Sequence, residues 1–172
     1  ATLKIPMTSL GQFTGCFRVK PPKTSTAVLP DLMIYSGRSI HTNEDQMWSI
    51  LVEESVLGYY AALEGSIDAD WTKYGQAIGT LHDCVWGRTV DATLELSPPG
   101  DANTLIRYLK ADGVPDPAAK GTMTQASFAI VNIPPGRHTI LAKKDGKTIA
   151  SLVIDATAGV LLDANMYPRA LP

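Results

Sequence analysis

The side chains best suited to metal or nucleophilic chemistry are three histidines and two cysteines, and they are scattered along the chain. His41, His82 and His138 have no HxH or HxxxH spacing, and Cys16 and Cys84 are single rather than paired as CxxC. A metal site needs such ligands to be clustered. We therefore expect no metal centre and no cofactor, and we expect the histidines to lie at the surface or at strand edges.

One short stretch, His82-Asp83-Cys84, places three residue types of a nucleophilic site next to one another. Neighbouring residues of a strand point to opposite faces, so His82 cannot contact the Cys84 thiol as a base while Asp83 orients its ring. The chain also contains no G-x-S-x-G sequence. These observations predict a protein that is not an enzyme.

Aromatic side chains gather in the middle of the chain, and such rings can stack on a ligand such as a sugar. Trp71, Tyr74 and Trp86 are the candidate ligand-stacking residues. The alternative is that Trp71 and Tyr74 pack a helix against the strands that follow.

Two pairs of carboxylates lie in turn-rich stretches, Asp68 with Asp70 and Asp112 with Asp116. Carboxylates in a loop can hold calcium, but aspartate also caps turns by bonding to its own backbone. We expect turn capping, and a calcium-stabilised loop is the alternative.

The elements that would position these residues are mostly strands. From Gln76 onward, β-rich runs alternate with turns at intervals of roughly 8–12 residues, which is typical of an all-β sandwich or barrel. Alternation predicts that the even-numbered residues from Val90 to Leu96 share one buried face, and Asp145-Gly146 predicts a type I′ hairpin turn. The predicted strands are Ala77–Asp83, Thr89–Leu96, Thr104–Leu109, Ala126–Ile133 (apolar on both faces, hence central), Arg137–Lys143, Lys147–Asp155 and Val160–Tyr167.

The N-terminal half is more mixed. Ala1–Met7, Phe13–Val19 and Asp31–Tyr35 alternate as strands. Met47–Val52 also fits a strand, although a helical period matches it too. Glu53–Leu63 predicts a short helix, because acidic residues occupy its first turn and an apolar stripe follows.

Composition and charge narrow the class of protein. A chain of 172 residues with 45% hydrophobic and 19% charged residues fits one folded domain or two small ones. A net charge of −2 leaves no basic excess for nucleic acid. Apolar stretches such as 159–162 fall far short of the ~20 residues that span a bilayer. Lys4, Pro6 and Ser9 interrupt any region typical of a signal peptide.

Three segments of the C-terminal half occur in an order that a known family shares. They are a G-x-L-x-D-C pattern from Gly79 to Cys84, then Val90–Leu96, and then Phe128–Gly136, a strand with a tight Pro-Gly turn. This order resembles the carboxypeptidase regulatory-like domain, a seven-stranded, Greek-key, transthyretin-like β-sandwich of exported bacterial proteins. The resemblance covers Gln76–Tyr167, about half of the chain, although Thr124–Ser127 replace the family's usual D-x-x-G turn.

The resemblance implies a mainly β fold with two parts. Residues 76–172 would form the sandwich, and residues 1–75 would hold N-terminal strands, a connector and a short helix. Ala1–Met7 and Phe13–Val19 resemble the closing strands of another such module. In a chain that resembles exported modules, Cys16 and Cys84 are candidates for a disulfide, with buried free thiols as the alternative.

We therefore expect a non-enzymatic structural subunit of an extracellular or cell-surface assembly. The strand Ala1–Met7, with Leu3, Ile5 and Met7 on one face, would complete a neighbouring subunit and build a homo-oligomer or filament. One alternative is a module that binds glycan or a surface protein through the aromatic-rich connector. Another is the accessory domain of a hydrolase whose catalytic residues lie elsewhere.

Overall fold

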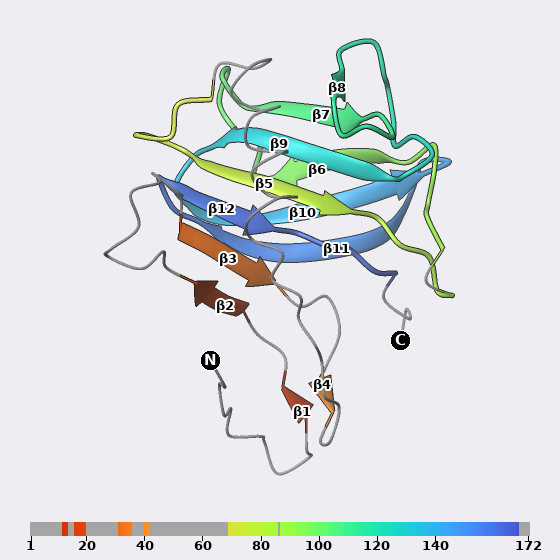
Figure 1. Ribbon diagram of the computed structural model, residues 1–172, viewed down its shortest axis with the longest axis horizontal. Coiled ribbons are helices and arrows are strands. Elements are labelled where there is room, and N and C mark those ends of the chain that lie inside the picture. The colour runs from red at the N-terminus through yellow and green to blue at the C-terminus, as the bar shows by residue number, and fades with distance from the viewer. Residues whose placement is uncertain are drawn as a thin grey trace.

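The computed structural model shows a mainly β protein with a seven-stranded sheet, a three-stranded sheet and one separate strand pair (Figure 1). It describes residues 69–85 and 87–168 with their side chains, and residues 12–13, 16–19, 31–35 and 40–41 by their backbone pairing. No helix occurs among these described residues. The predicted helix Glu53–Leu63 and the predicted strands Ala1–Met7 and Met47–Val52 lie outside them.

The larger sheet has seven strands in the order β2-β3-β12-β5-β9-β7-β8. β9 (Ser127–Ile133) lies between β5 (Gly75–Thr80) and β7 (Leu105–Leu109) and is antiparallel to both. Every residue of β9 is buried, which confirms the prediction of a central strand. The remaining strands are β2 (Cys16–Val19), β3 (Asp31–Tyr35), β8 (Pro115–Asp116) and β12 (Val160–Asp163).

The smaller sheet has three antiparallel strands in the order β11-β10-β6. These are β6 (Thr93–Ser97), β10 (Gly136–Lys144) and β11 (Lys147–Ala156). The turn between β10 and β11 has Asp145 at φ 51° and Gly146 at φ 74°. Two consecutive left-handed residues are what a type I′ turn requires, so the predicted hairpin is confirmed.

All seven predicted C-terminal strands are present, with different ends. In β6, Leu94 and Leu96 are buried while Thr93 and Glu95 are exposed, as the alternation predicted. The strand predicted to run to Asp83 ends earlier, since the residues after Thr80 form only single bridges. The short β8 was not predicted, because its Pro115 and Asp116 read as turn residues.

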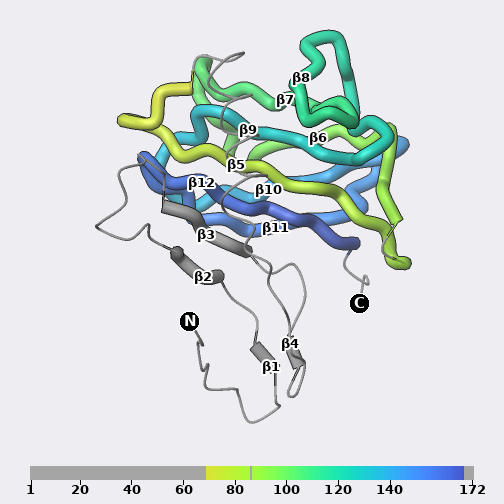
Figure 2. The backbone as a smooth tube through the Cα atoms, in the orientation of Figure 1, coloured from red at the N-terminus to blue at the C-terminus, as the bar shows by residue number. Residues whose placement is uncertain are grey.

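The two sheets pack face to face around one hydrophobic core (Figure 2). Phe128 and Ile130 of β9 meet Ile140 of β10 and Ile154 of β11 there, and all four side chains are fully buried. Burial of each such side chain contributes about 1.5–3 kcal/mol. This core is therefore the main source of stability in the described part.

The other face of the larger sheet is apolar as well. Ile78, Ala129 and Leu161 belong to a second buried cluster, and Trp71 and Leu105 pack against it. Successive residues of β9 thus enter two different clusters, which explains why the strand has no polar face.

Strands from the N-terminal half join the larger sheet. β3 has the bounds predicted from the sequence and pairs in parallel with β12, while β2 pairs antiparallel with β3. The predicted strand Phe13–Val19 is divided into β1 (Gln12–Phe13), which pairs with β4 (Ile40–His41), and β2. The expected division of the chain at residue 75 therefore falls within a single sheet.

Gly79 lies where the backbone of another segment leaves no room for a side chain. A Cβ at this position would collide with the carbonyl of Ala164 and lie 2.9 Å from Cζ of Phe128. Gly79→Ala is expected to lower the free energy of unfolding by about 3 kcal/mol, because backbone must move to relieve the overlap. Urea unfolding followed by circular dichroism measures this change.

The neighbouring variant Thr80→Ala is the matched control. It loses a 3.5 Å hydroxyl contact with Ser127 and a half-buried methyl group, so its stability should stay within about 1 kcal/mol of the wild type. A Gly79→Ala protein as stable as Thr80→Ala would contradict the close approach.

Candidate functional site

The loop that leads into β5 carries two of the three candidate ligand-stacking aromatics. Asp70 organises this loop: its Oδ1 accepts hydrogen bonds from the hydroxyl of Thr72 at 2.6 Å and from the amide of Thr72 at 3.0 Å. Its Oδ2 lies 3.1 Å from Nζ of Lys73. The Thr72 hydroxyl, and next the Lys73 ammonium, hold the pKa of Asp70 below its usual range.

The hydroxyl of Tyr74 joins this loop to the turn between β6 and β7. It donates to Oδ2 of Asp101 at 2.8 Å and accepts from Nδ2 of Asn103 at 3.0 Å. The bond from Tyr74, followed by the amide of Asn103, holds the pKa of Asp101 below its usual range. The polar end of this aromatic residue therefore connects two turns.

Trp71 is half-buried and packs against the second hydrophobic cluster, which includes Ala129 and Leu161. It thus lies against the sheet, while the helix expected to pack there lies outside the described residues. The third candidate, Trp86, also lies outside them, as do the candidate subunit-contact residues Leu3, Ile5 and Met7. The structure brings Trp71 and Tyr74 into one loop, where Trp71 packs on the sheet and Tyr74 bonds to the turn between β6 and β7.

A buried pair of amide side chains beside this loop escaped the sequence analysis. Oε1 of Gln76 accepts the backbone amide of Asn132 at 2.8 Å, and Nε2 of Gln76 lies 3.4 Å from Oδ1 of Asn132. The same Oδ1 accepts the amide of Asp70 at 2.9 Å. Asn132 has a φ of 59°, where the β5–β9 register shifts between Gly75 and Ala77. The presence of Asn132 within an otherwise apolar predicted strand was the sequence feature that could have indicated this pair.

The amide pair is bonded to a further loop. Nδ2 of Asn132 donates to the carbonyl of Asn103 at 3.3 Å, and the hydroxyl of Thr104 donates to the carbonyl of Asn132 at 2.7 Å. Gln76 and Asn132 therefore link β5, β9 and two loops at one end of the larger sheet. Because these polar atoms bond to one another, the arrangement fits a structural role.

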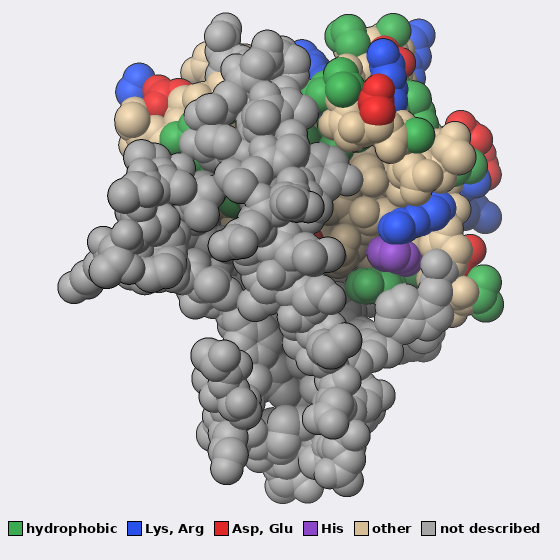
Figure 3. Space-filling model, viewed as in Figure 1, with side chains coloured by type: hydrophobic (Ala, Val, Ile, Leu, Met, Phe, Trp, Pro, Cys, Tyr) green, Lys and Arg blue, Asp and Glu red, His purple; other side chains and the backbone are tan. Residues whose placement is uncertain are grey.

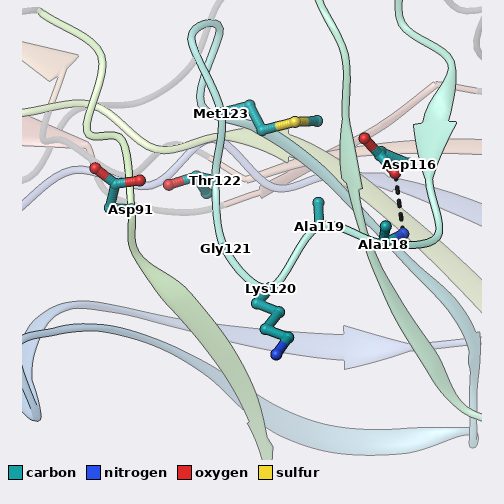
Figure 4. A pocket seen from close by; sticks show the side chains of 8 residues that line it. All are labelled: Asp91, Asp116, Ala118, Ala119, Lys120, Gly121, Thr122 and Met123. Carbon is teal, nitrogen blue, oxygen red and sulfur yellow. Dashed lines mark hydrogen bonds between the residues drawn. The ribbon is translucent and has the colours of Figure 1, made fainter.

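The structure also contains an open cleft of about 470 Å³ beside β8 (Figure 4). Asp91 and Asp116 lie at its two ends, and Lys120 extends away from both carboxylates. Oδ1 of Asp116 accepts the amide of Ala118 at 2.9 Å, and Thr122 donates its hydroxyl proton to Thr89. Asp116 thus bonds within its own loop, and the Thr122 hydroxyl joins that loop to the segment that holds Thr89 and Ala92.

The adjacent residues His82 and Asp83 make separate contacts. The ring of His82 stacks on Tyr167 with centroids 4.7 Å apart. Oδ1 of Asp83 instead accepts the amides of Val85 and Gly87 at 2.9 and 2.6 Å. The carboxylate thus shapes the turn that carries Cys84.

Two expectations about cysteine and histidine are wrong in this structure. Cys84 is a free, exposed cysteine, so the disulfide expected between Cys16 and Cys84 is not formed. His138 is buried rather than at the surface, since it lies on the inward face of β10, and its ring nitrogens lie 3.1 and 2.9 Å from the carbonyls of Pro98 and Pro134. These carbonyls allow the imidazole to be buried.

Asp112 and Asp116 cap turns, as expected. Oδ1 of Asp112 accepts the amide of Val114 at 3.0 Å, and Asp116 bonds in the same way to Ala118. Asp68 lies outside the described residues. Within those residues, no group of three or more His, Cys, Asp or Glu side chains could hold a metal ion.

Comparison with known proteins adds no family. No protein-family model matches the chain, and no curated protein matches it. In the described parts, no helix has the length and apolar character needed to cross a membrane. Figure 3 shows positive and negative side chains interspersed over the described part of one face, in keeping with the net charge of −2.

Replacement of Asn132 tests the buried amide pair. Asn132→Ala is expected to cost about 3 kcal/mol of unfolding free energy, since the amide of Asp70 and Nε2 of Gln76 lose the acceptor Oδ1 and alanine is strained at a φ of 59°. Asn132→Gly removes the amide but tolerates that φ, so it should be about 1 kcal/mol more stable than the alanine variant. Equal stability of Asn132→Ala and the wild type in urea titrations would exclude this role.

Removal of the Tyr74 hydroxyl tests its contact with Asp101. In Tyr74→Phe, the pKa of Asp101 should rise toward its usual range, as measured by carbon NMR titration of the carboxyl. A carboxyl group whose pKa is lowered by folding stabilises the fold at pH values above its unfolded-state pKa. This stabilisation is lost as the pH falls through its folded-state pKa. The variant should therefore lose less stability in acid. Tyr167→Phe is the control, and an unchanged Asp101 titration in Tyr74→Phe would refute the contact.

Proposed function

We propose that this protein is a non-enzymatic structural subunit of an extracellular or cell-surface assembly, in which strands of one copy complete a sheet of the next. One observation carries the proposal: β3, from the N-terminal half, pairs in parallel with β12 over four residues. Without β3 and β2, β12 would be an edge strand of the C-terminal part. An edge that accepts one added strand by backbone hydrogen bonds suits β-augmentation.

The fold proposed for residues 76–172 is a seven-stranded, Greek-key, transthyretin-like sandwich related to the carboxypeptidase regulatory-like domain. Its support is the strand arrangement: β12, β5, β9 and β7 form one layer, and β11, β10 and β6 form the other. The motif segments Val90–Leu96 and Phe128–Gly136 lie in and around β6, β9 and β10. Export is proposed on the same resemblance.

The chain between β4 and the described C-terminal part is long enough for strand exchange. Residues 42–68, fully extended, could reach roughly 90 Å. β3 can therefore pair with β12 of its own chain or with β12 of another copy. Exchange of an identical element between protomers is a low-cost route to an assembly, and a rotation that does not close produces a filament.

A second edge supports assembly through added strands. β11 has ten residues and pairs with β10 on one side. Among the described residues, its other side makes one isolated bridge, between Ala150 and Pro168. We expect the predicted strand Ala1–Met7 of a neighbouring copy to pair with this edge of β11.

A proline in β3 tests the proposal. Met33→Pro removes a backbone donor from the strand that pairs with β12, whereas Met33→Ala keeps that donor. We expect the wild type and Met33→Ala to form large assemblies in light scattering and electron microscopy, and Met33→Pro to form none. When mixed at low ratio with the wild type, Met33→Pro should accept a strand but donate none, and so shorten the assemblies.

Deletion of residues 1–10 identifies whether Ala1–Met7 contributes as well, and reduced assembly is the expected result. A wild-type chain that stays monomeric at high concentration would refute the structural role. In that case, binding on a glycan array would favour the alternative, a glycan- or protein-binding module.

A further inference from the structure

Asp163 is the one acidic residue in the four strands that form the centre of the larger sheet. Strands β12, β5, β9 and β7 contain two charged side chains, Asp163 and Arg107. Asp163 is half-buried at the end of β12, and Nδ2 of Asn165 donates to its Oδ1 at 2.8 Å. Burial raises the pKa of Asp163 to about 6. None of the roles described above uses this carboxyl group.

The register places Asp163 in a row of otherwise mostly apolar residues that crosses six strands. Asp163 lies between Ile34 of β3 and Ile78 of β5. From β2 to β7, the row is Phe17, Ile34, Asp163, Ile78, Ala129 and Arg107. With β3 in place, the carboxyl group therefore belongs to an interior strand and has an isoleucine position on either side.

The charged residues of the described neighbouring elements do not lie next to Asp163 in its row. Arg107 is three strands away, about 14 Å at the usual strand spacing. In β3 and β2, Asp31 pairs with Val160 and Arg18 pairs with Met33, so both lie in other rows. In the loop packed on this face of the sheet, Asp70 and Lys73 bond to each other. β5 contributes neutral residues only.

A charged residue has opposite effects in an edge strand and in an interior strand. On an exposed edge, an ionised carboxylate stays hydrated and discourages pairing with another strand. Once β3 covers that edge, the charge loses part of its water, and the protonated form is favoured. Asp163 is the last residue of β12, and it pairs with Ile34 of β3, the strand that covers this edge.

We propose that Asp163 makes the pairing of β3 with β12 depend on pH, with the protonated carboxyl group favouring the paired state and the carboxylate favouring its opening. The effect acts on the pairing itself, whichever copy supplies β3. Its consequence for assembly rests on the proposed function: opening frees both β3 and the edge of β12, so strands should exchange between copies faster at neutral pH than in acid.

The direction follows from the raised pKa. The paired state binds a proton that the open state releases, so pairing is strongest below the pKa of the open state and weakens as pH rises through about 6. If the open state titrates in the usual range of aspartate, the pairing constant should be about tenfold larger at pH 5.0 than at pH 7.5.

Hydrogen–deuterium exchange of the full chain, corrected for the intrinsic effect of pH on exchange, measures the pairing. In the wild type, protection of residues 31–35 and 160–163 should rise about tenfold from pH 7.5 to pH 5.0. Asp163→Asn should show strong, pH-independent protection there. The control Asp145→Asn removes the same charge in the type I′ turn, which accepts asparagine, and should behave as the wild type.

The outcomes separate this inference from the proposed function. Equal pH responses in Asp163→Asn and the wild type, or no response in either, would overturn the role of Asp163, even if the protein assembles. Protection that depends on pH in the wild type but not in Asp163→Asn supports it, even if light scattering finds only monomers. Protection of β9 and β10 in each variant verifies that the core is folded.

Discussion

The burial of β9 on both faces is the constraint on which the other elements depend. Phe128 and Ile130 enter the core between the sheets, while Ala129 and Val131 enter the cluster on the opposite face. A strand of this kind needs cover on both sides and hydrogen-bonding neighbours at both edges. β5 and β7 supply the edges, the smaller sheet covers one face, and the loop with Trp71 packs against the other.

The same constraint explains why the polar residues of the interior are bonded to one another. Gln76, Asn132 and His138 are buried, and each has hydrogen-bond partners on other segments. A buried polar group without a partner costs more than its hydrogen bond contributes. Such residues therefore specify where strands end and loops attach. A cluster of buried polar side chains that bond to one another can be structural without binding a ligand.

The edge at β12 differs from the centre of the sheet. β9 is apolar throughout, whereas β12 ends in a carboxylate that is half-buried beside the position of β3. In the interior of the sheet, burial of apolar side chains on both faces favours a single arrangement of the strands. A strand that adds beside Asp163 must desolvate a charge or bind a proton, and its pairing is accordingly easier to reverse.

Sequence patterns were enough to predict the seven C-terminal strands, the burial of β6 and β9, the bounds of β3 and the hairpin at Asp145-Gly146. These features depend on alternation and on turn residues, which act over a few neighbours. The folded chain was needed to find that Gln76 bonds to Asn132, that Tyr74 bonds to Asp101, that His138 is buried, that Cys84 is a free thiol and that Ile34 pairs with Asp163. Those facts depend on which distant segments become neighbours, and local periodicity carries no information on the partner across a sheet.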